Sequence, residues 1–141
     1  MIRFNKVSVK RVNNRGIHNI SFNIKGGRFV YLMGPTGAGK STIIKAIQRS
    51  INIDSGEIFV NDIDISKFRN KSLAHYRRSI GMIFQDFKLL NDRTIFENVA
   101  LPLQIIGCEK LKIVQRVDEI LLKIGLEKKN DMFPLELSGG E

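Results

Sequence analysis

The sequence predicts an α/β fold, and three observations support this class. Residues 2–9 and 20–24 place apolar side chains at the two-residue period that is typical of β-strands. Residues 29–33 (FVYLM) form a continuous apolar run of the kind found in strands buried on both faces. The second half of the chain places apolar residues at three- and four-residue spacing, which indicates amphipathic helices. With 141 residues, of which 43% are hydrophobic, the chain is long enough for a single domain with its own core.

The N-terminal half is expected to consist mainly of strands around one helix. The first strand, over residues 2–9, should contain an irregularity in its middle, because the alternation slips between Phe4 and Val7. The second strand, over residues 20–24, should end at the turn KGG. The elements predicted after residue 33 are a helix over 40–50 (KSTIIKAIQRS), a strand over 56–61 (GEIFVN), a short helix over 71–79 (KSLAHYRRS) and a second buried strand over 80–84 (IGMIF).

Two further helices are expected in the C-terminal part. Thr94 and Glu97 have the spacing of a capping box, so a helix should begin at Thr94 and be disturbed by Pro102. The next helix should cover about residues 109–124, with Gly125 as the residue that ends it. We expect its apolar residues to lie in the core, namely Ile113, Val114, Val117, Ile120, Leu121 and Ile124.

Charge is distributed unevenly along the chain. The net charge is +9, and residues 1–53 contain ten Lys or Arg and no acidic residue, whereas residues 54–141 contain 13 basic and 14 acidic residues. A basic region attracts nucleotide phosphates, anionic lipid headgroups or nucleic acid, and it is equally compatible with a solvated surface. The charge distribution alone therefore does not indicate which of these anions the protein binds. No apolar run approaches the roughly 18 residues of a membrane span, and the single Cys108 agrees with a reducing compartment.

The segment that carries chemistry is GPTGAGKS, residues 34–41, which matches the phosphate-binding pattern G-x-x-x-x-G-K-[ST] between a predicted strand and a predicted helix. Glycines let backbone N–H groups turn toward phosphate oxygens, and the helix N-terminus adds partial positive charge. We expect Lys40 to reach the β- and γ-phosphates and the Ser41 hydroxyl to bind Mg²⁺. The complete set expected to bind ATP phosphates is Gly34, Pro35, Thr36, Gly37, Ala38, Gly39, Lys40, Ser41 and Thr42.

Three more segments carry a resemblance to a known family. DSGEIFVNDIDIS, IGMIFQDFKLLNDRTIFENVALPL and LSGGE follow the phosphate loop in the order found in the ATP-binding subunits of ABC transporters. The resemblance begins at Met1 and implies one P-loop NTPase domain of the ABC ATPase fold. Residues 1–85 would form the P-loop core and an antiparallel β subdomain, and residues 86–141 the Q-loop and the start of the helical subdomain. Within the family, IGMIFQDFKLLNDRT is most similar to cell-division ATPases of the FtsE type, although lipoprotein-release and macrolide-type exporters share much of it.

The resemblance also implies roles for residues outside the phosphate loop. Gln85 resembles the Q-loop glutamine, which contacts Mg²⁺ and the attacking water. The signature motif, which closes over the ATP of the opposite subunit, is matched by Leu137, Ser138, Gly139, Gly140 and Glu141. These matches imply ATP and Mg²⁺ as cofactors, a head-to-tail homodimer and an FtsX-like integral membrane partner. The expected location is peripheral, on the cytoplasmic side of the membrane, with no nucleic acid bound.

Two departures from the family pattern affect the expected activity. Relatives often stack an aromatic side chain on adenine near the positions of Arg11 and Val12; here the Arg11 guanidinium could take this place or remain solvated. The Walker B Asp, the catalytic Glu and the switch His, which follow the signature in the family, are absent from these 141 residues. We therefore expect a cassette that is incomplete at its C-terminus and that binds ATP without hydrolysing it. The alternatives are a non-hydrolysing nucleotide-binding module from a truncated gene, the ATPase of a lipoprotein- or macrolide-type exporter, and a soluble ABC protein that acts on nucleic acid.

Overall fold

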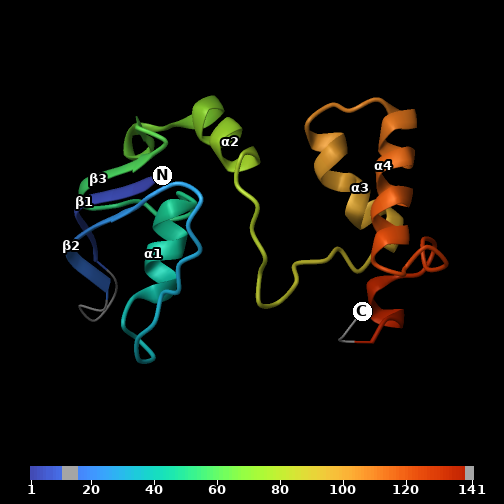
Figure 1. Ribbon diagram of the computed structural model, residues 1–141, viewed down its shortest axis with the longest axis horizontal. Helices are drawn as coiled ribbons and strands as arrows, with labels where there is room; N and C mark the ends of the chain where they lie inside the picture. The colour runs from blue at the N-terminus through green and yellow to red at the C-terminus, as the bar shows by residue number, and fades with distance from the viewer. Residues whose placement is uncertain (11–15, 139–141) are drawn as a thin grey trace. The chain divides into compact units, whose positions relative to one another are not determined.

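The structure is a computed structural model that describes residues 1–10 and 16–138 (Figure 1). Arg11 and Val12, which were considered for adenine stacking, lie outside the described residues, as do Gly139, Gly140 and Glu141 of the signature. The chain divides into two compact units, Met1–Gly81 and Met82–Glu141, and each is described by itself.

The first unit is built on a four-stranded antiparallel sheet with the order β2-β1-β3-β4. Its strands are β1 (Ile2–Lys10), β2 (Gly16–Ile24), β3 (Ser55–Val60) and the short β4 (Ile63–Asp64). Phe4 of β1 lies opposite Phe22 of β2 and Ile58 of β3. The alternating patterns near the N-terminus therefore predicted β1 within one residue, whereas β2 begins four residues earlier than predicted. The strand predicted over residues 56–61 corresponds to β3 within one residue at each end.

The irregularity expected in β1 is present. The register shifts between Phe4 and Val7 against β2, and between Asn5 and Ser8 against β3. Lys6 has a positive φ of 49° at this point. Gly56 of β3 faces the irregularity, and a Cβ atom there would collide with backbone carbonyl oxygens of β1. Glycine is therefore required where the two backbones approach each other most closely.

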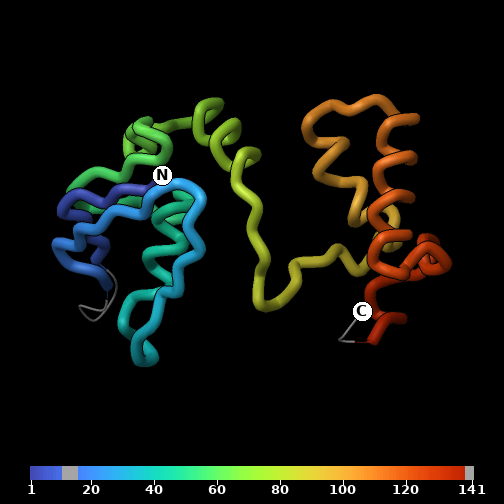
Figure 2. The backbone as a smooth tube through the Cα atoms, viewed as in Figure 1, coloured from blue at the N-terminus to red at the C-terminus, as the bar shows by residue number. Residues whose placement is uncertain are grey.

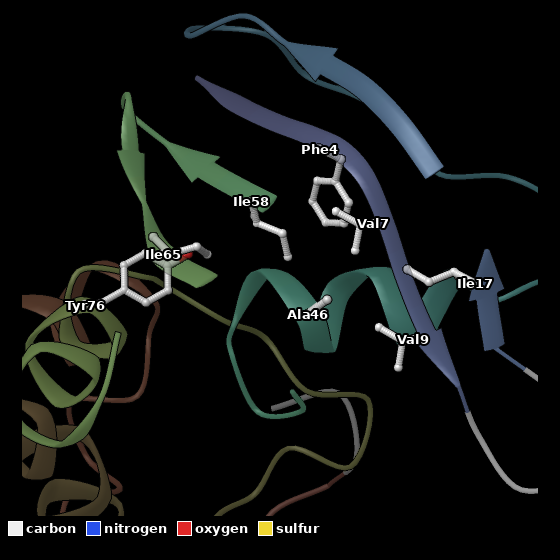
Figure 3. Packing of buried hydrophobic residues seen from close by; sticks show 8 residues of the cluster. All are labelled: Phe4, Val7, Val9, Ile17, Ala46, Ile58, Ile65 and Tyr76. Carbon is white, nitrogen blue, oxygen red and sulfur yellow. The ribbon is translucent and has the colours of Figure 1, made fainter. Parts of the chain in front are cut away.

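One face of this sheet is covered by α1 (Lys40–Ile47), and η2 (Ile65–Lys67) and α2 (Asn70–Arg78) close the same core. Thr42 and Ala46 are the buried residues of α1, and their spacing of four places both on one face of the helix. Figure 3 shows the side chains that converge between the sheet and these helices: Phe4, Val7, Val9, Ile17, Ala46, Ile58, Ile65 and Tyr76.

Two predicted strands are wrong. Residues 29–33 and 80–84 have no regular secondary structure, and Figure 2 traces them as irregular segments. Phe29 is 82% exposed and Ile83 is 96% exposed. A strand is stable only when a neighbour pairs with its backbone N–H and C=O groups, and none of the four strands β1–β4 in the described residues pairs with either segment. Apolar composition predicted burial here, but the described part of the chain does not cover these residues.

The second unit contains α3 (Ile95–Ile105), α4 (Lys110–Lys123) and the short η3 (Pro134–Glu136). The predicted capping box is confirmed: Thr94 Oγ1 accepts from the Glu97 N–H at 3.2 Å, and Glu97 Oε2 accepts from the Thr94 N–H at 2.9 Å. α3 continues through Pro102 to Ile105. The core of the unit consists of Ile95, Ala100, Ile113, Val117, Leu121 and Leu126. No helix in the described residues is long and apolar enough to cross a membrane.

The expectation for α4 is correct for one stripe of residues and wrong for its flanks. Gly125 follows the helix with a φ of 74°, as predicted. Ile113, Val117 and Leu121 are buried, whereas the other three expected core residues are exposed: Val114, Ile120 and Ile124. Helix α3 packs against the buried stripe of α4. Residues beside a stripe remain accessible when one neighbouring helix covers only part of the apolar arc.

Candidate functional site

The glycine-rich loop over residues 34–41 closes on itself just before α1. The N–H of Ala38 donates to the carbonyl oxygen of Pro35 at 3.2 Å. Lys40 begins α1, and its Nζ donates to the carbonyl oxygens of Gly34 at 2.6 Å and Pro35 at 2.8 Å. The ammonium therefore lies against the first turn of the loop, held by neutral carbonyl oxygens. Such a cation can exchange these contacts for the oxygens of an anion, with which its hydrogen bonds are stronger.

Two glycines of this loop have the same backbone conformation for different reasons. Gly37 and Gly39 have φ values of 84° and 91°. A Cβ at Gly37 would meet no atom within 4 Å, whereas a Cβ at Gly39 would lie 2.6 Å from Cγ2 of Ile17 and 3.4 Å from the carbonyl oxygen of Gly16. Gly37 thus leaves open space beside the loop. Gly39 lets the start of α1 pack directly on β2.

The N-terminus of α1 has no side-chain cap bond among the residues that the structure describes. Its N-cap is Gly39, and its first turn contains no acidic residue. The first backbone N–H groups of a helix lack intrahelical acceptors and carry partial positive charge, so they bind anions well. Ser41 is exposed in this turn, while the side chain of Thr42 is buried in the core. The loop, the helix end and Lys40 together form a site suited to an anion with several oxygens.

Metal binding at this loop would have to rely on hydroxyl and ligand oxygens. In the described residues, no group of three or more His, Cys, Asp or Glu could hold a metal ion. Mg²⁺ commonly keeps several waters and is bound through few protein oxygens plus the phosphates of its nucleotide. The exposed Ser41 hydroxyl beside the anion-binding donors fits that mode, in which the phosphates of the nucleotide supply most of the negative charge that balances the ion.

Gln85 lies in an exposed turn of the second unit, whereas the loop over residues 34–41 belongs to the first unit. The next residue, Asp86, forms a 2.6 Å ion pair with Lys88. The hydrogen bond from Lys88 lowers the pKa of Asp86 below its usual value. Both side chains are exposed, so this pair orients the turn without adding much stability.

The described part of the signature is anchored by one apolar side chain. Leu137 packs against the α3–α4 core, and its N–H donates to the carbonyl oxygen of Pro134 at 3.3 Å. Immediately before η3, the N–H of Phe133 donates to Glu136 Oε2 at 2.6 Å. Ser138 follows Leu137 at the surface. The packing of Leu137 therefore fixes the point from which the signature leaves the helical unit.

The structure also assigns a role to Asn98, for which the sequence analysis had no hypothesis. Its Oδ1 accepts from the Leu90 N–H at 2.8 Å. Its Nδ2 contacts the carbonyl oxygens of Leu90, Arg93 and Thr94 at 2.9–3.1 Å. These bonds attach the segment that follows the Gln85 turn to the first turn of α3. In the sequence, the feature that could have predicted this role is an Asn inside a predicted helix, because Asn is unfavourable there unless its side chain makes hydrogen bonds.

The family model of the ABC transporter matches residues 17–141. The chain belongs to the ABC transporter family. Its curated relatives include the cell division ATP-binding protein FtsE of Bacillus subtilis, 46% identical over 127 residues, with 90% of this chain and 56% of the relative covered. FtsE of Streptococcus pneumoniae is 41% identical over 135 residues, with 94% and 59% covered. The methionine import ATP-binding protein MetN of Photobacterium profundum is 43% identical over 145 residues, with 100% and 42% covered. This ABC transporter chain thus spans less than two thirds of these relatives.

Solved structures agree with the family and with its fold. A dimeric post-hydrolysis state of the ATP-binding cassette MJ0796, bound to ADP and Pi, matches with a TM-score of 0.85 and 33% identity over 99% of this chain and 64% of that chain. A second dimeric structure of the same bacterial cassette matches with a TM-score of 0.86. The predicted α/β P-loop NTPase fold of the ABC ATPase type is therefore confirmed.

Proposed function

We propose that this chain binds Mg²⁺–ATP through residues 34–42 as the nucleotide-binding part of an ABC-type ATPase. The observation that carries the proposal is the loop geometry, in which Lys40 Nζ and the uncapped N-terminus of α1 border the same glycine turns. Backbone N–H groups of the loop and of the first turn of α1, such as those of Gly37, Gly39 and Ser41, bind phosphate oxygens, and Lys40 reaches the β- and γ-phosphates. Thr42 contributes through its backbone, because its side chain is buried.

When bound, Mg²⁺ would supply positive charge that neutralises the phosphates of the nucleotide. Ser41 would hold this ion through its hydroxyl. A contact of the Gln85 side-chain amide with the same ion is part of this proposal. We propose that these 141 residues do not turn over ATP, because a carboxylate that holds the metal shell and one that orients water are both needed. The sequence of these 141 residues contains no match to the Walker B Asp or to the catalytic Glu of the family, which supports this proposal.

Binding and turnover are tested together with two matched lysine variants. Calorimetry with Mg²⁺–ATP should show binding by the wild-type chain and a loss of about 10-fold or more in affinity in Lys40→Ala, the range expected for a charged hydrogen bond. Lys45→Ala, an exposed lysine in the last turn of α1, should bind like the wild type. Equal weakening by both variants would contradict the site. Phosphate release by the wild-type chain that disappears in Lys40→Ala would overturn the claim of no turnover.

The assembly we propose is a head-to-tail homodimer in which Leu137, Ser138, Gly139, Gly140 and Glu141 face the ATP of the opposite subunit. The dimeric state of the matched cassettes supports it. The chain would act at the cytoplasmic side of the membrane with an FtsX-like integral membrane protein in cell division, without binding nucleic acid. The FtsE relatives support this choice, and the MetN relatives favour a transport function as the alternative.

Partner choice is decided by co-purification from detergent-solubilised membranes. We expect the chain to be retained by an FtsX-type membrane protein and not by a methionine-import permease expressed at the same level. Retention by the permease alone favours the MetN-like alternative. Nucleic-acid binding that weakens steeply with salt at physiological ionic strength would overturn the expectation that none is bound.

A further inference from the structure

Helix α2 holds the C-terminal end of the helix that begins at the phosphate loop. The Tyr76 hydroxyl donates to the carbonyl oxygen of Ile47 at 2.7 Å. The Arg77 guanidinium donates from Nε to the carbonyl oxygen of Gln48 at 3.3 Å and from Nη2 to that of Arg49 at 2.5 Å. These acceptors are the last residue of α1 and the two residues after it. Two consecutive side chains of α2 therefore contact three consecutive carbonyls at one end of α1.

The Tyr76 hydroxyl supplies a donor for the Ile47 carbonyl at the end of α1, where the three preceding carbonyls accept from backbone N–H groups of residues 48–50. The last four carbonyl groups of a helix have no intrahelical donor, and the partial negative charge at this end favours a cation. Tyr76 is buried, and burial raises its pKa to about 12, so the hydroxyl stays protonated as a donor at neutral pH. Arg77 supplies the positive charge in a planar group that reaches two carbonyls at once. The pair thus does more than fill space beside the helix.

The other end of α1 is fixed by close packing. Gly39 lies against Ile17 and Gly16 of β2, and Thr42 and Ala46 are buried in the core. A helix of eight residues is about 12 Å long. Because it is so short, a tilt at its C-terminal end changes the direction of the N–H groups at its N-terminal end. Phosphate recognition depends on that direction, since a site that is loose by a fraction of an ångström binds poorly.

We infer that Tyr76 and Arg77 are positioning residues for the nucleotide: by holding the C-terminal end of α1, they set the direction of the donors at Gly39 to Ser41. The inference rests on the proposed binding of ATP at this loop. Coupling between two equilibria is reciprocal, so ATP bound at the N-terminal end stabilises the docking of α2 at the other end. Residues 79–85 continue directly from α2, so the segment that carries Gln85 starts from an element linked to nucleotide occupancy.

Amide hydrogen exchange of residues 68–80, measured with and without saturating Mg²⁺–ATP, tests this linkage. In the wild type, ATP should slow exchange in α2 by about 5-fold or more, the low end of typical coupling between sites. Arg77→Ala should lose this ATP-dependent difference and weaken ATP binding by a similar factor. Arg78→Ala removes the adjacent, exposed arginine, for which no bond to α1 is described, and should behave like the wild type.

Tyr76→Phe separates positioning from folding, because it removes one hydroxyl and keeps the buried ring. It should remain folded by circular dichroism and reduce the ATP-dependent protection even if Arg77→Ala unfolds. A merely structural role would lower the stability of Tyr76→Phe but leave both its ATP affinity and its ATP-dependent protection unchanged, and this result would overturn the inference. Wild-type binding of ATP without slower exchange in α2 would overturn it as well. Absence of wild-type binding in calorimetry would instead overturn the proposed function, and the inference with it.

Discussion

Replacement of Gly39 by alanine should destabilise the first unit through two separate effects. The φ of 91° at Gly39 lies in the left-handed region, where a residue with a Cβ loses about 1–2 kcal/mol. The new Cβ would also lie 2.6 Å from Cγ2 of Ile17, well inside the contact distance of about 3.5–4.0 Å between carbon atoms. Ile17 is buried in the core and cannot turn away freely. Overpacking of this kind adds about 1–3 kcal/mol, so the total loss should be about 2–5 kcal/mol.

Gly37→Ala is the matched control for this variant. Its φ of 84° imposes the same backbone strain, but a Cβ at Gly37 meets no atom within 4 Å. The expected loss in free energy of unfolding is therefore only about 1–2 kcal/mol. The difference between the two alanine variants isolates the close approach of α1 to β2.

Urea unfolding followed by circular dichroism measures both losses. In a double-mutant cycle, Ile17→Ala removes the colliding methyl, so combining it with Gly39→Ala should give a smaller loss than the sum of the two single variants by about 1 kcal/mol or more. Equal losses in Gly37→Ala and Gly39→Ala would refute the packing argument. Strict additivity in the cycle would show that Ile17 is not the residue that requires glycine at this position.

Three further predictions concern the sheet, a helix cap and a buried phenol. Gly56→Ala should lower the free energy of unfolding by more than about 3 kcal/mol, because its Cβ would strike the backbone of β1. Gly27→Ala, where the Cβ would meet open space, should lower it by only about 1 kcal/mol. Similar losses for the two variants in urea unfolding would contradict this. Thr94→Ala should lower the free energy of unfolding by about 1 kcal/mol and speed amide exchange in the first turn of α3, and Glu97→Gln should lower the free energy by less. An unchanged stability in Thr94→Ala would contradict the stabilising role of this cap. Burial raises the pKa of Tyr76 from 10.0 to about 12, so the unfolded chain loses this proton first and stability falls as pH rises from 10 to 12, by up to roughly 2–3 kcal/mol. Tyr76→Phe should lack that fall, and identical alkaline profiles of the two proteins would disprove it.

Elements stabilised by residues close together in the chain could be predicted from the sequence. The period of two in β1 and β2, the Thr94–Glu97 cap and the turn at Gly125 all depend on neighbours within a few residues. The glycine loop was also recognisable from its local pattern. The structure then added the contact of Lys40 with the loop carbonyls and the different reasons for Gly37 and Gly39.

Predictions failed where burial depends on a partner element. Residues 29–33 and 80–84 have the composition of buried strands, yet no described strand pairs with them. Val114 and Ile120 of α4 fit an apolar helix face, but they flank the stripe that packs on α3 and remain exposed. Apolar composition indicates that burial of a segment would be favourable, but it does not identify the element that would cover that segment.

The sequence by itself determined the family, the place of the glycine-rich loop, the start of α3 and the end of α4, because each of these depends on short-range spacing and on residue type. Only the tertiary structure decided how α1 is held. Gly39 packs on β2 at one end, and at the other Tyr76 binds the carbonyl oxygen of Ile47, 29 residues earlier in the chain. Contacts over such separations depend on which elements meet when the core forms, and a local pattern of residues does not contain that information.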